Sequence, residues 1–377
     1  MTRFLLWALL SLMAPAAFPQ TVTPPPIAAR AYLLVDTLSG LTLAAAAEND
    51  RFEPASLTKL MTAYVVFQAL REHKIDLAQP VTPSPRAQRA VGSRMFIEAG
   101  TPVAVADLIR GMIIQSGNDA TTSLAEAVGA TEEGFVAMMN AQAERLGLGN
   151  TKFMNATGVP AAGHYSSARD MVTLAGALMR DFPEQYPLYS QREFTFNKIR
   201  QGNRNRLLWT DPTVDGMKTG FTEAAGYCLL ASAKRGDRRL ISIVLGTQSD
   251  TARTIESQKL LNFGFQAYET RLLYRKGQAV ATPEILKGTR GSVPLGFDHD
   301  VWLTLPRERF TGLAGVLETR QPFVAPLAAG QKAGIIKITR ENAPLAEYPV
   351  VALEEVPVAG FLSRGWDTLR LMFRRPP

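Results

Sequence analysis

Hydrophobic and polar positions follow two different periods along this chain, and each period predicts a different kind of element. Up to about residue 266, apolar residues recur at helical spacing, interrupted by short apolar runs typical of buried strands. The helical patterns cover Ala55–Leu70, Val105–Ile114, Ala120–Val128, Thr131–Leu146 and Ala168–Met179. The strand patterns cover Tyr32–Asp36, Tyr227–Ala233 and Leu240–Gly246.

The strand patterns lie at opposite ends of this first region, which predicts a single sheet built from distant segments. With helices filling the middle, the fold class is expected to be α+β, with helices packed on a mainly antiparallel sheet. After about residue 270 the pattern changes to short alternating runs, such as Val301–Leu305 and Ile336–Thr339, separated by turn residues. This second region is predicted to be a small all-β domain, a sandwich.

The N-terminus has the pattern of a secretory signal peptide. Arg3 precedes an apolar core from Phe4 to Met13, and Ala14–Ala16 is a candidate cleavage site. The core is too short to span a membrane, and an uncleaved N-terminal anchor is the alternative. The predicted organisation is a signal peptide at 1–20, a Pro-rich linker at 21–27, an α+β domain at 28–266, a β domain at 270–358 and an amphipathic helix at 360–377.

The C-terminal segment interleaves apolar residues with arginines from Phe361 to Arg375. This spacing is typical of a basic amphipathic helix that lies in a membrane interface, and a helix packed on its own domain is the alternative. The net charge of +7 suits an anionic membrane surface or a cell-wall polymer. No motif for nucleic-acid binding is found, so a nucleic-acid partner is not expected.

Three short motifs, far apart in the chain, predict one active site. They are Ser56-Leu57-Thr58-Lys59, Ser116-Gly117-Asn118 and Lys218-Thr219-Gly220. Ser56 is the only serine with a lysine three residues later. Either of the lysine-containing motifs alone would be read as a solvated pair or a turn. All three motifs in this order and at these spacings indicate an enzyme that forms an ester on a serine.

Each motif supplies groups that such chemistry needs. A serine hydroxyl needs an adjacent base, and residues three apart share one face of a helix, so Ser56 and Lys59 meet if a helix starts near Ala55. Lys59 can act as a base only if its pKa is lowered, and both burial and the nearby cation Lys218 are expected to lower it.

The other motif residues suit the substrate. Ser116 can pass a proton toward a leaving amine, and Asn118 can hold a substrate amide. Lys218 and Thr219 suit a substrate carboxylate, while Gly220 allows a ligand to approach the backbone closely. For Arg253, the guanidinium matches a carboxylate, and the alternative is an exposed arginine at the start of a helix covering Ile255–Phe263.

Longer segments around the motifs resemble the low-molecular-mass penicillin-binding proteins, the D-alanyl-D-alanine carboxypeptidases of the peptidase S11 family. The segments are Ala31–Asp36, Pro54–Thr62, Ser166–Met171 and Val214–Gly220, and Arg253–Leu261 resembles the stretch that holds the family's carboxylate-binding arginine. The resemblance covers residues from about 28 to 270 and continues more weakly to the C-terminus. It implies a β-lactamase/transpeptidase-like catalytic domain.

The resemblance also implies roles for individual residues. Ser56 is then the acylated nucleophile and Lys59 the general base, while Ser116, Asn118, Lys218, Thr219 and Arg253 take the remaining roles. The oxyanion hole is formed by two backbone N–H groups, those of Ser56 and Phe221. Phe221 follows Gly220 at a position that is often histidine in similar sequences, so the side chain departs from the pattern while the N–H is retained.

The implied activity is removal of the terminal D-alanine from peptidoglycan pentapeptide stems, with β-lactams as covalent inhibitors. The implied location is the periplasm, on the outer face of the cytoplasmic membrane. The second motif reads Ser-Gly-Asn, and no counterpart of the β-lactamase deacylation glutamate is evident, which points away from class A β-lactamases. The loop Val91–Phe96 resembles a family loop that affects deacylation. A β-lactamase, an endopeptidase and a catalytically silent wall-binding module remain as alternatives.

No metal or cofactor is expected. The three histidines, His73, His164 and His299, are too scattered for a metal site. His164 is a candidate to line the cleft. Cys228, the only cysteine, lies in an apolar run and is expected to be a buried core residue.

Overall fold

The computed structural model describes residues 22–319 and 321–373, so the predicted signal peptide at 1–20 lies outside the described residues. Two compact units divide at Thr270 and Arg271. The first contains all three motifs, and the second contains the later β-rich region.

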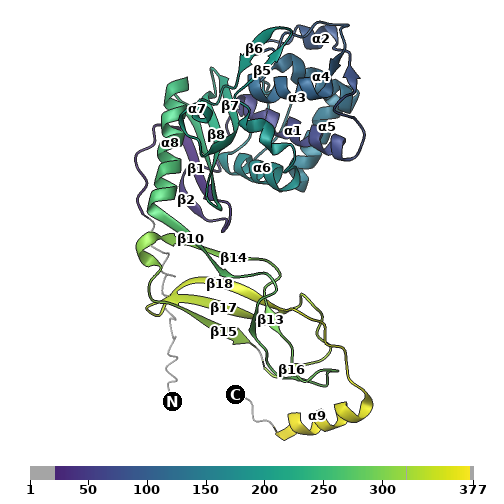
Figure 1. Cartoon of the computed structure of the whole chain (residues 1–377), viewed down its shortest axis with the longest axis vertical. Helices are drawn as coiled ribbons and strands as arrows, with labels where there is room; N and C mark the ends of the chain where they lie inside the picture. The colour runs from purple at the N-terminus through teal and green to yellow at the C-terminus, as the bar shows by residue number, and fades with distance from the viewer. Residues whose placement is uncertain (1–21, 320, 374–377) are drawn as a thin grey trace, which may run out of the picture. The chain divides into compact units, whose positions relative to one another are not determined.

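The first unit is built on a five-stranded antiparallel sheet in the order β2-β1-β9-β8-β7 (Figure 1). Its strands are β1 (Ala31–Asp36), β2 (Thr42–Ala46), β7 (Val214–Thr222), β8 (Gly226–Arg235) and β9 (Arg238–Thr247). β1 pairs directly with β9, with Leu34 opposite Ser242. The prediction of one sheet joining the two ends of this region is therefore confirmed.

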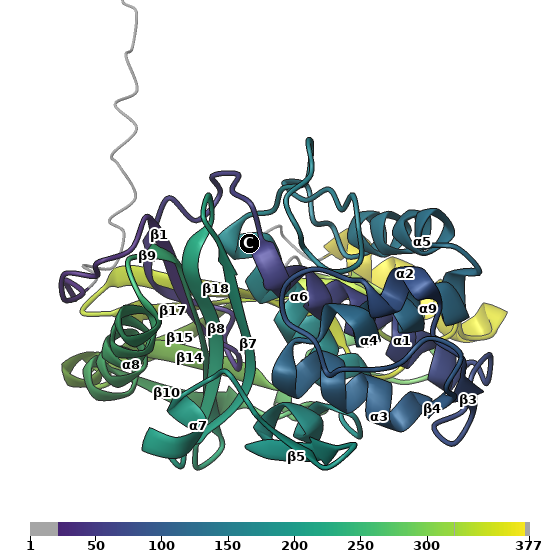
Figure 2. The same cartoon turned by 90° about the horizontal axis from the view of Figure 1, so that it is seen from above.

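Helices cover both faces of this sheet, as Figure 2 shows with α8 on one side and α1, α4 and α6 on the other. Leu33 packs with the larger group of helices, whereas its neighbour Leu34 packs toward α8. Alternation along a strand sends successive side chains to opposite faces, so an apolar run without polar positions indicates a strand covered on both sides.

The helices of this unit include those predicted, close to their predicted positions, and further short helices that were not predicted. The described helices are α1 (Lys59–Arg71), α2 (Pro85–Gln88), α3 (Val105–Arg110), α4 (Asn118–Gly129), α5 (Glu132–Arg145), α6 (Ala168–Asp181), α7 (Leu207–Thr210) and α8 (Asp250–Ala267), with 3₁₀ turns η1 (Ala55–Thr58) and η3 (Tyr186–Ser190) and a π-helical turn η2 (Gly111–Gln115). Two short pairs complete it: β3 (Pro80–Val81) with β4 (Val103–Ala104), and β5 (Glu193–Phe196) with β6 (Ile199–Gly202).

Two helix predictions need correction, and both fall at the motifs. The helix expected from Ala55 begins as the 3₁₀ turn η1 and becomes α-helical only at Lys59. The helix expected over Val105–Ile114 changes at Gly111 into the π-helical turn η2. Turns of this kind alter the direction of side chains locally and are frequent at functional sites.

The described residues of the second unit after Arg271 are all-β apart from one short turn and a helix near the C-terminus, which confirms the predicted class of this region. Its main sheet has the order β11-β13-β18-β17-β15, and β14 pairs with β10. Residues of β14 and β17, including Leu303 and Ile336, share one apolar core, as expected for two packed sheets. The elements are β10 (Tyr268–Tyr274), β11 (Ala279–Ala281), β12 (Ile285–Leu286), β13 (Leu295–Gly296), β14 (Val301–Pro306), η4 (Arg307–Arg309), β15 (Leu313–Thr319), β16 (Phe323–Val324), β17 (Lys332–Arg340), β18 (Ala343–Ala352) and α9 (Phe361–Phe373).

Candidate active site

The first motif joins a hydroxyl and an amine across one turn. Ser56 lies in η1 and Lys59 is the first residue of α1, and the Lys59 Nζ lies 3.0 Å from the Ser56 Oγ. The predicted contact is therefore present, although a 3₁₀ turn makes it. Ala55 has a φ of +47°, and a side chain on Gly158 would collide with the Ala55 carbonyl oxygen. This strained, closely packed turn fixes where the Ser56 hydroxyl lies.

Lys59 is buried, with 2% of its surface exposed, among groups that orient its amine. Besides Ser56, its Nζ donates to the Asn118 Oδ1 and to the Thr157 carbonyl oxygen, both at 2.6 Å. Burial and the positive charge of Arg204 lower the pKa of Lys59 to about 7, with Asp119 acting in the opposite direction. A substantial fraction of the amine is therefore neutral near pH 7 and can accept a proton.

The second motif follows η2 and opens α4. Ser116 adopts the left-handed conformation with a φ of +64°, Gly117 precedes the helix, and Asn118 is the first residue of α4. This sharp reversal presents Ser116 and Asn118 to the same space. The Ser116 Oγ accepts a hydrogen bond from the Lys218 Nζ at 2.9 Å, which links the second motif to the third.

The third motif lies on β7, a strand that the sequence pattern did not predict. Lys218 is opposite Leu230 of β8, and its amine reaches the Ser116 Oγ. Burial, followed by the positive charge of Lys59, lowers the pKa of Lys218 well below its ordinary value. Arg204, which sequence analysis missed, is a cation that lowers the pKa of Lys59 beside burial, while the repulsion between Lys59 and Lys218 lowers the pKa of Lys218.

Gly220 has a structural reason to lack a side chain. A Cβ on it would lie 3.2 Å from both the Ala55 Cβ and the Pro54 carbonyl oxygen. The absence of a side chain at Gly220 therefore lets β7 approach the chain segment before Ser56 closely.

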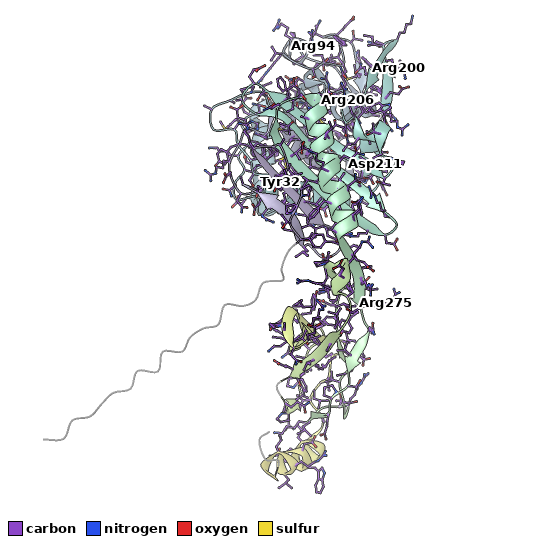
Figure 3. All side chains as sticks on the ribbon, turned by 90° about the vertical axis from the view of Figure 1, so that its left-hand side faces the viewer. Tyr32, Arg94, Arg200, Arg206, Asp211 and Arg275 are labelled. Carbon is purple, nitrogen blue, oxygen red and sulfur yellow. The ribbon has the colours of Figure 1, made fainter. Side chains whose placement is uncertain are left out.

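Arg253 of α8 forms the far end of the site. Only 6% of its surface is exposed, which excludes the alternative of an exposed arginine. Its Nη1 donates to the Gly220 carbonyl oxygen at 3.2 Å, and its guanidinium also pairs with Asp250 in the first turn of α8. Arg206 pairs with the same carboxylate at 2.5 Å, beside the start of α8 (Figure 3).

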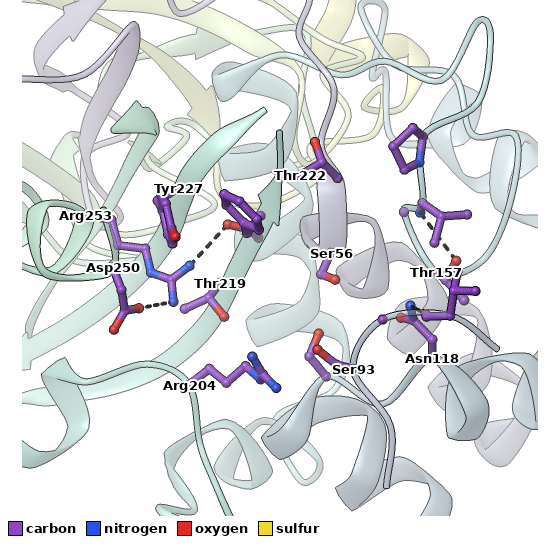
Figure 4. Close-up of a pocket in the computed structure, with 18 of the residues that line it drawn as sticks. Ser56, Ser93, Asn118, Thr157, Arg204, Thr219, Thr222, Tyr227, Asp250 and Arg253 are labelled. Atoms are coloured by element: carbon purple, nitrogen blue, oxygen red, sulfur yellow. Dashed lines mark hydrogen bonds and ion pairs between the residues drawn. The ribbon is translucent and has the colours of Figure 1, made fainter. Parts of the chain in front are cut away.

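These elements enclose a cavity of about 720 Å³ (Figure 4). Ser56 lies near the middle of the labelled side chains, between Thr219 and Arg253 on one side and Asn118 and Thr157 on the other. Seven predicted site residues line the cavity: Ser56, Ser116, Asn118, Thr219, Gly220, Phe221 and Arg253. Lys59 and Lys218 lie behind this wall, buried, and reach the cavity through their hydroxyl partners.

Several groups around the cavity were missed by sequence analysis. Arg204 lines the wall, Thr157 contributes a backbone carbonyl oxygen, and Tyr227 packs against Phe221 with 4.3 Å between ring centroids. None of these belongs to a motif, and a carbonyl oxygen has no signature in a sequence. The signal for Arg204 is its position between two asparagines that fix the local backbone. The Asn203 Nδ2 donates to the Gln191 carbonyl oxygen, and the Asn205 Nδ2 donates to the Gly216 carbonyl oxygen.

Two further predictions have clear outcomes. His164 does not line the cavity; it is buried behind Thr58, with 2.9 Å between the Thr58 Oγ1 and the His164 Nε2, and burial lowers its pKa to about 4. Cys228 is buried in the core as predicted, and burial raises its pKa to about 11. Within the part of the chain that the structure describes, no cluster of three or more metal-ligating side chains occurs.

Comparison with known families places the fold and site in a class. The fold and the three converging motifs define a penicillin-binding serine enzyme, and two family models match the chain. The model described as D-alanyl-D-alanine carboxypeptidase matches residues 18–249, and the model described as penicillin-binding protein 5, C-terminal domain, matches residues 268–358. The chain belongs to the D-alanyl-D-alanine carboxypeptidase family.

Similar proteins extend over nearly the whole chain. The D-alanyl-D-alanine carboxypeptidase DacC of Escherichia coli is 44% identical over 98% of this chain and 94% of its own length. DacA of the same organism is 42% identical over 93% of this chain and 89% of its own. The crystal structure of penicillin binding protein 5 from Haemophilus influenzae has a TM-score of 0.86 at 41% identity, covering 89% of this chain and 99% of that chain.

Proposed function

We propose that this protein removes the terminal D-alanine from peptidoglycan stem peptides through an ester formed on Ser56. The observation that carries the proposal is the Lys59–Ser56 contact of 3.0 Å, made by an amine whose pKa is lowered to about 7. A neutral amine at hydrogen-bond distance is what a serine needs to lose its proton during attack.

In the proposed first half-reaction, Lys59 takes the hydroxyl proton while the Ser56 Oγ attacks the carbonyl carbon of the last peptide bond. The backbone N–H groups of Ser56 and Phe221 would stabilise the oxyanion. The proton held by Lys59 would then pass to the leaving amine through Ser116, which is bonded to Lys218, so that Lys59 is neutral again. In the second half-reaction, Lys59 takes a proton from the attacking water and returns it to the Ser56 Oγ as the ester bond breaks, which releases the shortened peptide and restores Ser56.

The substrate's terminal carboxylate is proposed to lie at the Thr219 and Arg253 end of the cavity. Arg253 is held by Gly220 and Asp250, and an oriented guanidinium matches a carboxylate with two parallel hydrogen bonds. Asn118, bonded to Lys59 through its Oδ1, would hold the substrate amide. β-Lactams, which present a carboxylate and a strained amide, are expected to acylate the same Ser56.

The test is incubation of the full chain with a stem pentapeptide ending in D-Ala-D-Ala, beside Ser56→Ala, followed by mass measurement. Loss of one alanine with the wild type alone is expected. Monomers released from cross-linked dimers would instead indicate an endopeptidase, and rapid hydrolysis of a chromogenic cephalosporin would indicate a β-lactamase. A folded wild type without any of these activities would support a silent wall-binding module.

We further propose that the protein acts in the periplasm, attached to the membrane surface through α9. Among the described helices, none has the length and apolarity needed to cross a membrane. α9 contacts its own unit through polar groups, since the Asp367 Oδ2 accepts the Lys287 N–H at 2.6 Å and Arg370 pairs with Glu284 at 3.1 Å. Phe361 and Trp366 are 83% and 68% exposed, which supports an apolar surface available to lipid.

This attachment is tested by sedimentation of the full chain with vesicles of anionic or neutral lipid. Binding to anionic vesicles that weakens in Phe361→Ser with Trp366→Ser is expected. Equal recovery of the wild type and this double variant with the vesicles would contradict the role of α9.

A further inference from the structure

Asp119, which directly follows the second motif, is a buried carboxylate in an unusual setting. Only 1% of its surface is exposed, and its partners are backbone N–H groups. It accepts hydrogen bonds from Met95 at 2.9 Å, Phe96 at 2.8 Å, Ile97 at 3.3 Å and Ala120 at 2.9 Å. Charge-assisted bonds of this kind are stronger than neutral ones, so together they hold the segment 95–97 firmly.

The held segment continues into a wall of the active-site cavity. Val91, Gly92 and Ser93 line that cavity. Asn118 completes the attachment from the other side: its N–H donates to the Ser93 carbonyl oxygen at 2.6 Å, and its Nδ2 donates to the Val91 carbonyl oxygen at 2.5 Å. Phe96 has a φ of +68°, a conformation that a bulky residue rarely adopts without support.

Gly117 is part of the same arrangement. A Cβ at this position would lie 2.9 Å from the Asp119 Oδ1 and 3.1 Å from the Met95 backbone nitrogen. The middle position of the second motif therefore lacks a side chain because the Asp119 carboxylate and the loop occupy that space. This gives a physical reason for the sequence Ser-Gly-Asn in this chain.

Asn118 connects the loop to the proposed base, because its Oδ1 accepts a hydrogen bond from the Lys59 Nζ while its Nδ2 holds Val91. A displaced loop would therefore move the amide that orients Lys59. The charge of Asp119 acts on the same amine, since it raises the pKa of Lys59 against burial and Arg204. Lys218, whose own pKa is lowered by Lys59, is the other titratable group facing this amine.

We propose that Asp119 is a positioning residue for the reaction: it clamps the loop of residues 91–97 onto the second motif and thereby holds Asn118 against Lys59. The inference rests on the proposed function. Because the clamp lies on the Asn118 side of Ser56, away from Arg253, its loss should slow the chemical steps more than it weakens substrate binding (Figure 4).

The test compares Asp119→Asn with the wild type in the full chain. A misplacement of about 1 Å can cost roughly 100-fold in rate, so a fall in kcat of that order is expected, with little change in KM. The low-pH limb of the kcat/KM profile should also move to lower pH, because removing the negative charge lowers the pKa of Lys59 further. Amide exchange of residues 91–97 should accelerate.

Two matched variants separate the clamp from simple loss of stability. Gly117→Ala places a Cβ against the clamp but leaves the carboxylate charged, so kcat should fall without the shift in the pH profile. Asp170→Asn removes another buried carboxylate, one that accepts the Asn150 N–H at 2.8 Å outside the cavity, and should leave kcat and the exchange of residues 91–97 unchanged.

Unchanged kcat and unchanged loop exchange in Asp119→Asn would overturn the proposal, as would equal losses of kcat in Asp119→Asn and Asp170→Asn. An inactive wild type would contradict the proposed function instead. In that case, amide exchange of residues 91–97 in Asp119→Asn would still test whether Asp119 holds the loop, because this measurement does not require an active enzyme.

Discussion

Lysines in the two units of this protein experience opposite environments. Lys59 of the first unit is buried near Arg204, and its pKa is lowered to about 7. Lys337 of the second unit lies on a strand face with a hydrogen bond from its Nζ to Glu318 at 2.8 Å, and this carboxylate raises its pKa. The same side chain is therefore a candidate base in one unit and a permanent cation in the other.

The two units also differ in how many polar and charged side chains they bury. Lys59, Lys218 and Arg253 are buried around one cavity, whereas Thr304 is the only buried polar side chain identified among the described residues after Arg271. Burying cations near one another opposes folding unless their hydrogen bonds are satisfied. The first unit tolerates this arrangement because both amines are hydrogen-bonded: Lys59 donates to Asn118 and Thr157. Lys218 donates to the Ser116 Oγ and to the Thr219 carbonyl oxygen.

The largest effect is expected when the buried amine of Lys59 is removed. Lys59→Met should lower the rate of D-alanine release by about 10² to 10⁴-fold, the range that a positioned general base contributes. Rates measured beside a thermal unfolding curve separate this effect from misfolding. Activity within tenfold of the wild type would show that Lys59 is not the base.

The pH dependence of the reaction should follow the lowered pKa of Lys59. Since the base must be neutral, kcat/KM should decline as the pH falls through about 7, approaching a tenfold loss per unit at lower pH. D-Alanine release measured between pH 5 and 9 gives the profile. A flat profile across pH 6 to 8 would contradict the assignment.

Substitution of Arg253, at the end of the cavity proposed to bind the substrate carboxylate, should lower activity less than loss of Lys59 does. Arg253→Lys keeps the charge but loses the planar fork, and a charge-assisted hydrogen bond contributes about 1.5–3 kcal/mol, so kcat/KM should fall by roughly 10 to 100-fold. A pentapeptide ending in a carboxamide supplies the control, because it should be a poor substrate for the wild type and lose little more in the variant. Equal sensitivity of both substrates to the substitution would place the carboxylate elsewhere.

Substitution of the surface lysine Lys337 should have the smallest effect on activity. Lys337→Met removes a pair with Glu318 that is partly exposed, and such pairs contribute little to stability. Its kcat/KM and its pH profile should match those of the wild type. A change in the low-pH limb would mean that distant charges, rather than the local environment of Lys59, set the profile.

Sequence reasoning succeeded where a local pattern carried the information. The helical periods located α4, α5 and α6, and the three motifs located groups that meet around one cavity. It failed on β7, because Val214–Thr222 contains two glycines and a lysine and lacks the apolar run expected of a buried strand.

The remaining failures concern contacts between distant segments. Arg204 and Asp119 act on Lys59 through space, and neither residue belongs to one of the three motifs. The 3₁₀ turn at Ala55 is closely approached by Gly158 and Gly220, which lie far from Ser56 in the sequence. These features depend on tertiary packing, which overrides local preference.

The most direct test of the account is to locate the serine that a β-lactam acylates. The full chain would be incubated with penicillin and digested, and the peptide carrying the added mass would be sequenced, alongside Ser56→Ala and Ser93→Ala. The account predicts an adduct on Ser56 that is absent from Ser56→Ala and retained in Ser93→Ala. An adduct on Ser93 or Ser116, which line the same cavity, would contradict it.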